Sequence, residues 1–164
     1  MISAGEALDA AKRYWNKVPV DVFALARELG LGPKFEPLDD AISGLIRRVD
    51  GDNWEIVINK FHARVRQRFT CAHEIGHFIF HRALLQDGVS DTLAYRADIG
   101  ELPNPNIGWQ QERQANNFAA NLLVPSAWLT AAKAAGFSDT KDLAKHFEVS
   151  ETVMRIKMGL PLNG

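Results

Sequence analysis

The alternation of apolar and polar residues predicts helices toward both ends of the chain and a pair of strands between them. Ser3 followed by Glu6 is typical of a helix N-cap, and apolar residues at helical spacing continue to Trp15. Two stretches rich in isoleucine and valine, 43–49 and 54–59, flank a turn of aspartate, glycine and asparagine, which favours a β-hairpin. Further helices are expected at 19–30, 69–85, 109–124, 126–135, 138–147 and 150–158.

The segment 69–85 differs from the other expected helices because it is apolar around most of its circumference, which predicts a helix buried in the middle of the domain. Before the hairpin, 32–40 is expected to be irregular or an edge strand. After the central helix comes a connection of about 20 residues, a length that is uncommon unless the segment is functional. These patterns predict an α+β fold: one mostly helical domain over 1–164, with a small antiparallel sheet beside the central helix and a C-terminal helical pair at about 138–158.

Composition narrows the class of protein. The 164 residues are 46% hydrophobic and 24% charged, as in globular domains, and 19 basic residues nearly balance 20 acidic ones. This balance disfavours binding of nucleic acid or anionic membrane by the molecule as a whole. The single cysteine, Cys71, and an N-terminus without the features of a secretory signal lead us to expect a cytoplasmic protein, and we expect no membrane span.

Candidate chemistry lies in the central helix, where His73, Glu74 and His77 form an H-E-x-x-H pattern. Histidines four residues apart differ by about 40° around a helix axis, so both imidazoles leave one face and can bind one zinc ion. Glu74 lies beside them, where its carboxylate can accept a proton from a water molecule that the metal activates. The pattern therefore predicts a hydrolytic zinc site.

Such a site needs a third protein ligand. The candidates are His81, Cys71, Glu112 and the acidic residues of the long connection, Asp87, Asp91, Asp98 and Glu101. Cys71 faces away from the histidines, and His81 lies about 12 Å along the helix from His73. His81 therefore fits better as a residue that lines the cleft or supports a ligand, and it fits a hydrogen-bonded core histidine equally well. Glu112 has Asn116 one turn later on the same face, which is consistent with a buried polar pair, although spacing alone favours a solvated glutamate.

Two longer motifs resemble those of the ImmA/IrrE family of metallo-endopeptidases. Residues 68–78, R-F-T-C-A-H-E-I-G-H-F, resemble that family's metal-binding core, and residues 112–125, E-R-Q-A-N-N-F-A-A-N-L-L-V-P, resemble its second motif. The resemblance covers about residues 18–128. It implies zinc, or manganese in its place, held by His73, His77 and Glu112, with Glu74 as the catalytic acid and base.

The resemblance also implies a partner. Family members typically cleave a helix-turn-helix repressor encoded nearby, in stress-response, phage or mobile-element circuits, and others act in toxin–antitoxin pairs. The first hypothesis is therefore a zinc endopeptidase that cleaves such a repressor or antitoxin. The second is a toxin-like or binding partner of a helix-turn-helix antitoxin, with a zinc site that performs no hydrolysis.

Weaker signals concern the substrate. An extended peptide could add to a sheet edge, and the strand at 54–59 is the candidate. The residue that stabilises the oxyanion stays open among His62, Arg66, His81 and Tyr95. The C-terminal pair has the rhythm of a helix-turn-helix, but its last helix offers only Arg155 and Lys157 beside Glu151, so direct DNA binding is disfavoured.

Overall fold

The computed structural model describes residues 2–85, 90–92 and 106–162. The helices are α1 (Ala4–Arg13), the short 3₁₀ helix η1 (Tyr14–Asn16), α2 (Val22–Glu28), α3 (Arg64–Leu85), α4 (Trp109–Leu123), α5 (Ser126–Ala134), α6 (Thr140–Phe147) and α7 (Glu151–Lys157). The strands are β1 (Lys34–Glu36), β2 (Gly44–Asp50), β3 (Asn53–Asn59) and β4 (Ser90–Thr92). The fold is α+β, as the patterns predict.

The caps expected from the sequence begin several of these helices. Ser3 and Glu6 form a reciprocal capping box at α1, Asp21 caps α2, and Ser150 caps α7. Two starts differ from expectation: α2 begins after Pro19 rather than at it, and Asp139, not Ser138, caps α6. The central helix α3 begins at Arg64, earlier than the apolar run. Its first turn is mostly polar, so the hydrophobic pattern does not include it.

The sheet has the strand order β1-β3-β2-β4. β2 is antiparallel to β3, as expected for a hairpin, and also to β4, but β1 pairs with β3 in parallel. The expectation of a wholly antiparallel sheet is therefore wrong, and the segment expected to be irregular or an edge strand supplies the parallel edge. The strand at 54–59 is wrong as a substrate edge, because β1 and β2 already occupy both of its sides.

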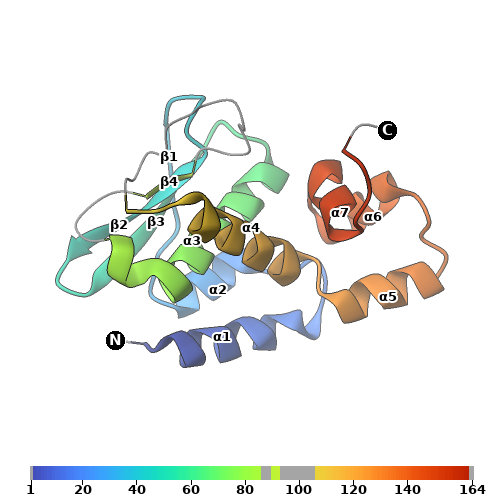
Figure 1. The fold of residues 1–164 in the computed structure, drawn as a ribbon, viewed down its shortest axis with the longest axis horizontal. Helices are drawn as coiled ribbons and strands as arrows, with labels where there is room; N and C mark the ends of the chain where they lie inside the picture. Colours follow the sequence, from blue (N-terminus) through green and yellow to red (C-terminus); the bar gives the residue numbers. More distant parts are fainter. Residues whose placement is uncertain (1, 86–89, 93–105, 163–164) are drawn as a thin grey trace.

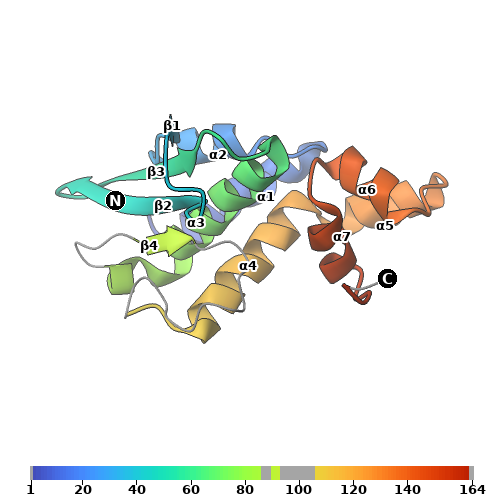
Figure 2. The same ribbon diagram turned by 90° about the horizontal axis from the view of Figure 1, so that it is seen from above.

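α3 runs through the middle of the molecule, and the sheet, α1, α2 and α4 pack around it (Figures 1 and 2). The sheet lies toward one end and α5–α7 toward the other, with α3 and α4 between them. Gly44 of β2 fits against this helix because a Cβ there would lie 2.5 Å from Thr70 Cγ2. The close approach holds the sheet against the helix that carries the histidines.

The C-terminal helices join this body through polar contacts. Arg68 of α3 is 2% exposed, and its Nε donates to the backbone carbonyl of Glu148 at 3.0 Å. Glu148 occupies the turn between α6 and α7 in the left-handed conformation, with φ +50°. On the other side, Lys157 of α7 donates to Asn121 of α4 and, at 3.2 Å, to Ser126 of α5. The helical pair is thus anchored to both α3 and α4.

Candidate metal centre

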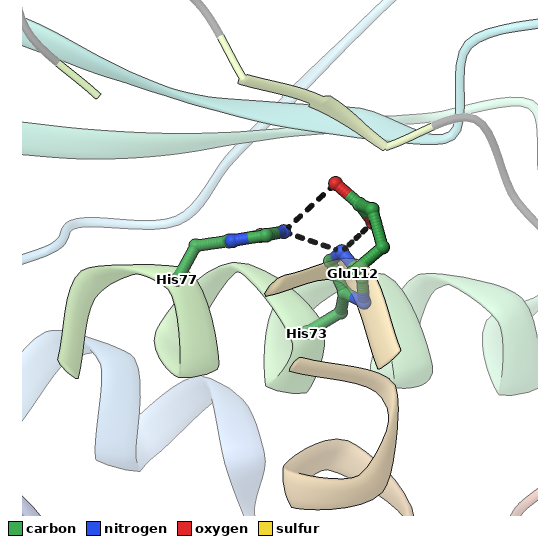
Figure 3. A group of neighbouring side chains, drawn as sticks. All are labelled: His73, His77 and Glu112. Atoms are coloured by element: carbon green, nitrogen blue, oxygen red, sulfur yellow. Dashed lines mark hydrogen bonds and ion pairs between the residues drawn. The ribbon is translucent and has the colours of Figure 1, made fainter. Parts of the chain in front are cut away.

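The two histidines of the pattern project from one face of α3, as their spacing predicts. His73 and His77 are 1% and 0% exposed, and their Nε2 atoms lie 2.9 Å apart. Figure 3 shows both rings standing above α3. Two imidazole nitrogens so close together in the protein interior lose their hydration, so burying them is costly unless a cation or a proton donor occupies the space they face.

Glu112, in the first turn of α4, completes the group. Its two carboxylate oxygens lie 3.2 Å from His73 Nε2 and 3.3 Å from His77 Nε2 (Figure 3). Its side chain is 19% exposed, so it is not the solvated glutamate that spacing alone allows. The helices can approach closely because Gly76 faces Ala115: a Cβ on Gly76 would lie 3.2 Å from Ala115 Cα.

The triangle of donor atoms fits a divalent metal ion. In a tetrahedral zinc site with ligands at about 2.05 Å, neighbouring donors are roughly 3.3 Å apart. The two imidazole nitrogens are 2.9 Å apart, and each lies 3.2 or 3.3 Å from one of the two carboxylate oxygens of Glu112, distances close to this value. Among the residues that the structure describes, His73, His77 and Glu112 are the group of histidine, cysteine or acidic residues arranged to hold a metal.

The protonation of the group also suits a cation. Burial lowers the pKa of His77 to about 4, so this imidazole is neutral at pH 7. Burial alone would raise the pKa of Glu112, but hydrogen bonds from His73 and His77 outweigh it and lower the pKa to about 2. A neutral imidazole and an ionised carboxylate are the forms that bind metal ions.

Further side chains hold the imidazoles from behind. His73 Nδ1 lies 2.8 Å from Asn116 Oδ1, and His77 Nδ1 lies 3.0 Å from His81 Nδ1. Asn116 and His81 are the two residues that the sequence predicts near the site, and each contacts an imidazole on the side away from Glu112. His81 therefore does not compete as the third ligand. Gln114, whose Oε1 lies 3.0 Å from His81 Nε2, is an additional contact that the sequence analysis missed.

Glu74 follows His73 in α3 and is fully buried. Cys71 is buried as well, with Sγ 3.9 Å from the carbonyl oxygen of Val22 in α2. Burial, followed by the negative charge of Glu74, raises the pKa of this thiol well above its usual range. Cys71 is thus a neutral core residue, as its position on the helix predicts.

The other residues considered as a metal ligand or as the group that stabilises the oxyanion fall into two groups: those that the structure describes and those outside the described residues. His62 lies against the 38–42 segment, with Nε2 3.1 Å from the carbonyl oxygen of Asp40, and Arg66 donates to Ser43 Oγ at 3.0 Å. Asp91 belongs to β4. The other candidates lie outside the residues that the structure describes: Asp87, Tyr95, Asp98 and Glu101.

A helix that carries H-E-x-x-H and a glutamate from a second helix together define the class of metallopeptidase-like domains. Comparison with family models gives a more specific result. Residues 26–158 match the family described as IrrE N-terminal-like domain, Peptidase M78, and the chain belongs to this family. The match extends through the C-terminal helical pair, beyond the region over which the two motifs suggest the resemblance.

Comparison with solved structures agrees on the fold. The chain is similar to a Mycobacterium tuberculosis transcriptional regulator, with a TM-score of 0.64 and 15% sequence identity. The match covers 94% of this chain but 46% of the regulator, so the chain spans less than half the length of that protein. No curated protein matches the chain significantly in sequence. No helix among the described residues is long and apolar enough to cross a membrane.

Proposed function

We propose that this protein is a zinc-dependent endopeptidase. The observation that carries the proposal is the convergence of two buried imidazole nitrogens and one carboxylate at 2.9–3.3 Å from one another. A structural zinc site ordinarily has four protein ligands, whereas a catalytic site has three and leaves one position for water or substrate. Zinc suits the two nitrogens and one oxygen best, and manganese could take its place.

When bound, the metal would polarise the scissile carbonyl and activate water for attack. The rest of the chemistry belongs to the chain. Glu74 accepts the proton from the attacking water and returns it to the amine that leaves, which makes it the general base and then the general acid. Burial within α3 keeps its carboxylate out of bulk water. His73, His77 and Glu112 hold the metal, while Asn116 and His81 support the imidazoles.

The substrate would lie along β4 rather than along β3, the strand expected at 54–59. β4 ends the strand order and contacts α3, the helix that carries both histidines. In Figure 3 this strand passes over the three side chains. Its ladder pairs it with β2 on one side, with Leu45 opposite Asp91. An extended peptide that added to the outer side of β4 would run past the metal ligands.

A helix-turn-helix repressor or antitoxin encoded nearby is the proposed substrate, which places the reaction in the cytoplasm. The family resemblance supports this, and the solved structure of similar fold is itself a transcriptional regulator. Direct DNA binding is not part of the proposal, because the cations of α7 are engaged within the protein. Arg155 contacts Glu151 at 3.6 Å and the carbonyl oxygen of Pro161 at 2.7 Å, and Lys157 contacts α4 and α5.

We also propose that residues 1–164 form one metallopeptidase-like domain. The contact from Arg68 to Glu148 and those of Lys157 tie the C-terminal pair to the two helices of the metal centre. The family match includes this pair as well. A domain boundary before α6 would have to cross these polar contacts, and boundaries normally fall where few contacts cross.

Glu74→Gln tests the proposal. Zinc-loaded parent protein, the same protein stripped of metal, and zinc-loaded Glu74→Gln would each be incubated with the helix-turn-helix protein encoded beside this gene. We expect cleavage by the loaded parent, none by the stripped protein, and a loss of about 10²- to 10⁴-fold in the variant, which keeps its metal. Binding of the candidate substrate by loaded parent and variant without cleavage by either would favour the non-hydrolytic partner. Equal cleavage by both would exclude Glu74 as the base.

A further inference from the structure

A row of polar side chains continues from the metal centre toward the surface. His81 lies one turn beyond His77 on α3 and is 5% exposed. Its Nδ1 lies 3.0 Å from His77 Nδ1, and its Nε2 lies 3.0 Å from Oε1 of Gln114 on α4. The row therefore joins a metal ligand, a buried histidine and a side-chain amide across the contact between the two helices.

Metal binding would fix the position of every proton in this row. An imidazole that offers its Nε2 lone pair to a metal carries its proton on Nδ1. His77 Nδ1 then donates to His81 Nδ1, which must be an unprotonated acceptor. The proton of His81 is therefore on Nε2, which donates to the amide oxygen of Gln114. Each of the two contacts thus has one donor and one acceptor, and the row ends on an oxygen that needs no further partner.

We propose that His81 and Gln114 are positioning residues for His77, and that together they hold its ring so that Nε2 points at the metal. This inference rests on the proposed metal site. The two imidazoles of that site are held differently: Asn116 contacts His73 directly, whereas α4 reaches His77 only through His81. Both sets of contacts end on α4, the helix that also supplies Glu112, so this helix influences the position of all three ligands.

The size of the effect follows from what such contacts do in other metal sites. Residues that hydrogen-bond to a metal-binding histidine fix its tautomer and ring orientation, and their loss typically weakens metal binding by roughly 10- to 100-fold. Gln114 contacts the row at its outer end, where the side chain is exposed. We therefore expect its removal to fall near the lower limit, at about tenfold, and removal of His81 to cost more.

Three exchanges on α4 separate positioning from packing. Gln114→Met keeps the length and helix propensity of the side chain but removes the acceptor. Gln114→Glu keeps an acceptor oxygen at the same reach. Gln110→Met makes the first exchange at another exposed glutamine, one turn earlier on α4. His81→Phe then removes the middle of the row while keeping a ring of similar volume.

Zinc affinity would be measured by competition with a chelator, and the ligand field by the visible absorption of the cobalt-substituted proteins. We expect Gln114→Met to bind zinc about tenfold more weakly and to shift the cobalt spectrum. Gln110→Met should match the parent, and Gln114→Glu, which keeps an acceptor, should bind zinc at least as tightly as the parent. Melting temperatures of the metal-free proteins would show that the variants are folded. Parent-like zinc affinity and cobalt spectrum in both Gln114→Met and His81→Phe would overturn this inference but leave the proposed metal site intact. Failure of the parent to bind zinc or cobalt would overturn the metal site and the inference with it.

Discussion

Two neighbouring amides on α4, Asn116 and Asn117, differ in what they contact. Asn116 Oδ1 accepts from His73 Nδ1 at 2.8 Å, whereas Asn117 is exposed on the outer face of the helix. Asn116→Ala should therefore weaken zinc binding by roughly tenfold or more, because His73 loses the partner that fixes its tautomer. Asn117→Ala makes the same exchange one position away and should leave the affinity unchanged. Chelator competition checks both, and equal affinities would remove Asn116 from the centre.

How much of the site could be predicted from the sequence depends on whether the residues in contact are close together along the chain. His73, Glu74 and His77 lie within five residues of α3, and helical geometry alone places the two imidazoles on one face. Glu112 could be singled out only through the resemblance, because its partners lie on another helix. Its carboxylate meets them across the contact between α3 and α4, which no spacing within α4 encodes.

Gln114 was missed for a related reason. Two residues from Glu112 it points about 200° away around the helix, so a search for residues on the ligand face excludes it. The available signal was the row His73, His77, His81 in α3, since a buried third histidine needs a partner for its outer nitrogen. That partner lies on α4, beyond the reach of any local pattern.

Between elements, the approach of α3 to α4 depends on Gly76. A Cβ at this position would lie 3.1 Å from Phe118 Cδ1 and 3.2 Å from Ala115 Cα. Gly76→Ala should push α4 outward by a few tenths of an ångström and displace Glu112 from the imidazoles. Overpacking costs about 1–3 kcal/mol, against about 1 kcal/mol gained from helix propensity. We expect lower thermal stability of the metal-free protein and weaker zinc binding together.

The control for that exchange is Gly5→Ala in α1, where a Cβ would have nothing within 4 Å. It should stabilise the protein by up to about 1 kcal/mol and leave zinc affinity unchanged. Thermal unfolding and chelator competition measure the two effects. Parent-like zinc affinity in Gly76→Ala would mean that α4 can shift without carrying Glu112 away.

The sheet shows what patterns of single elements leave out. The turn between β2 and β3 is local, and the hairpin is found where the sequence predicts it. The neighbours on either side of that hairpin come from segments of three residues, too short for a reliable pattern. Whether β1 pairs with β3 in parallel is decided by how the chain returns from α2, which is a property of packing.

In the whole molecule, Arg68 joins α3, the helix that carries the two histidines, to the C-terminal pair. Arg68→Ala removes the donor to the Glu148 carbonyl and should lower the free energy of unfolding by about 2 kcal/mol, as for hydrogen bonds to charged groups. Glu148→Gln keeps that carbonyl and removes only a carboxylate that is 41% exposed, so it should cost under about 1 kcal/mol. Urea denaturation measures the free energy of unfolding of both variants. A similar decrease in the two would mean that the ion pair, and not the contact with the carbonyl, provides the stabilisation.

His77 and Glu112 are separated along the chain by the whole segment 78–111. An ion bound by both would therefore join two parts of the chain that are far apart in sequence. Because these ligands come together only in the folded protein, binding of the ion would stabilise the folded form. At a hundredfold excess of free metal over its dissociation constant, binding to the folded form alone stabilises it by about 2.7 kcal/mol. The supply of metal in the cell would then govern the lifetime of the protein as well as its catalytic activity. A shortage of metal would raise the unfolded fraction and expose the protein to degradation.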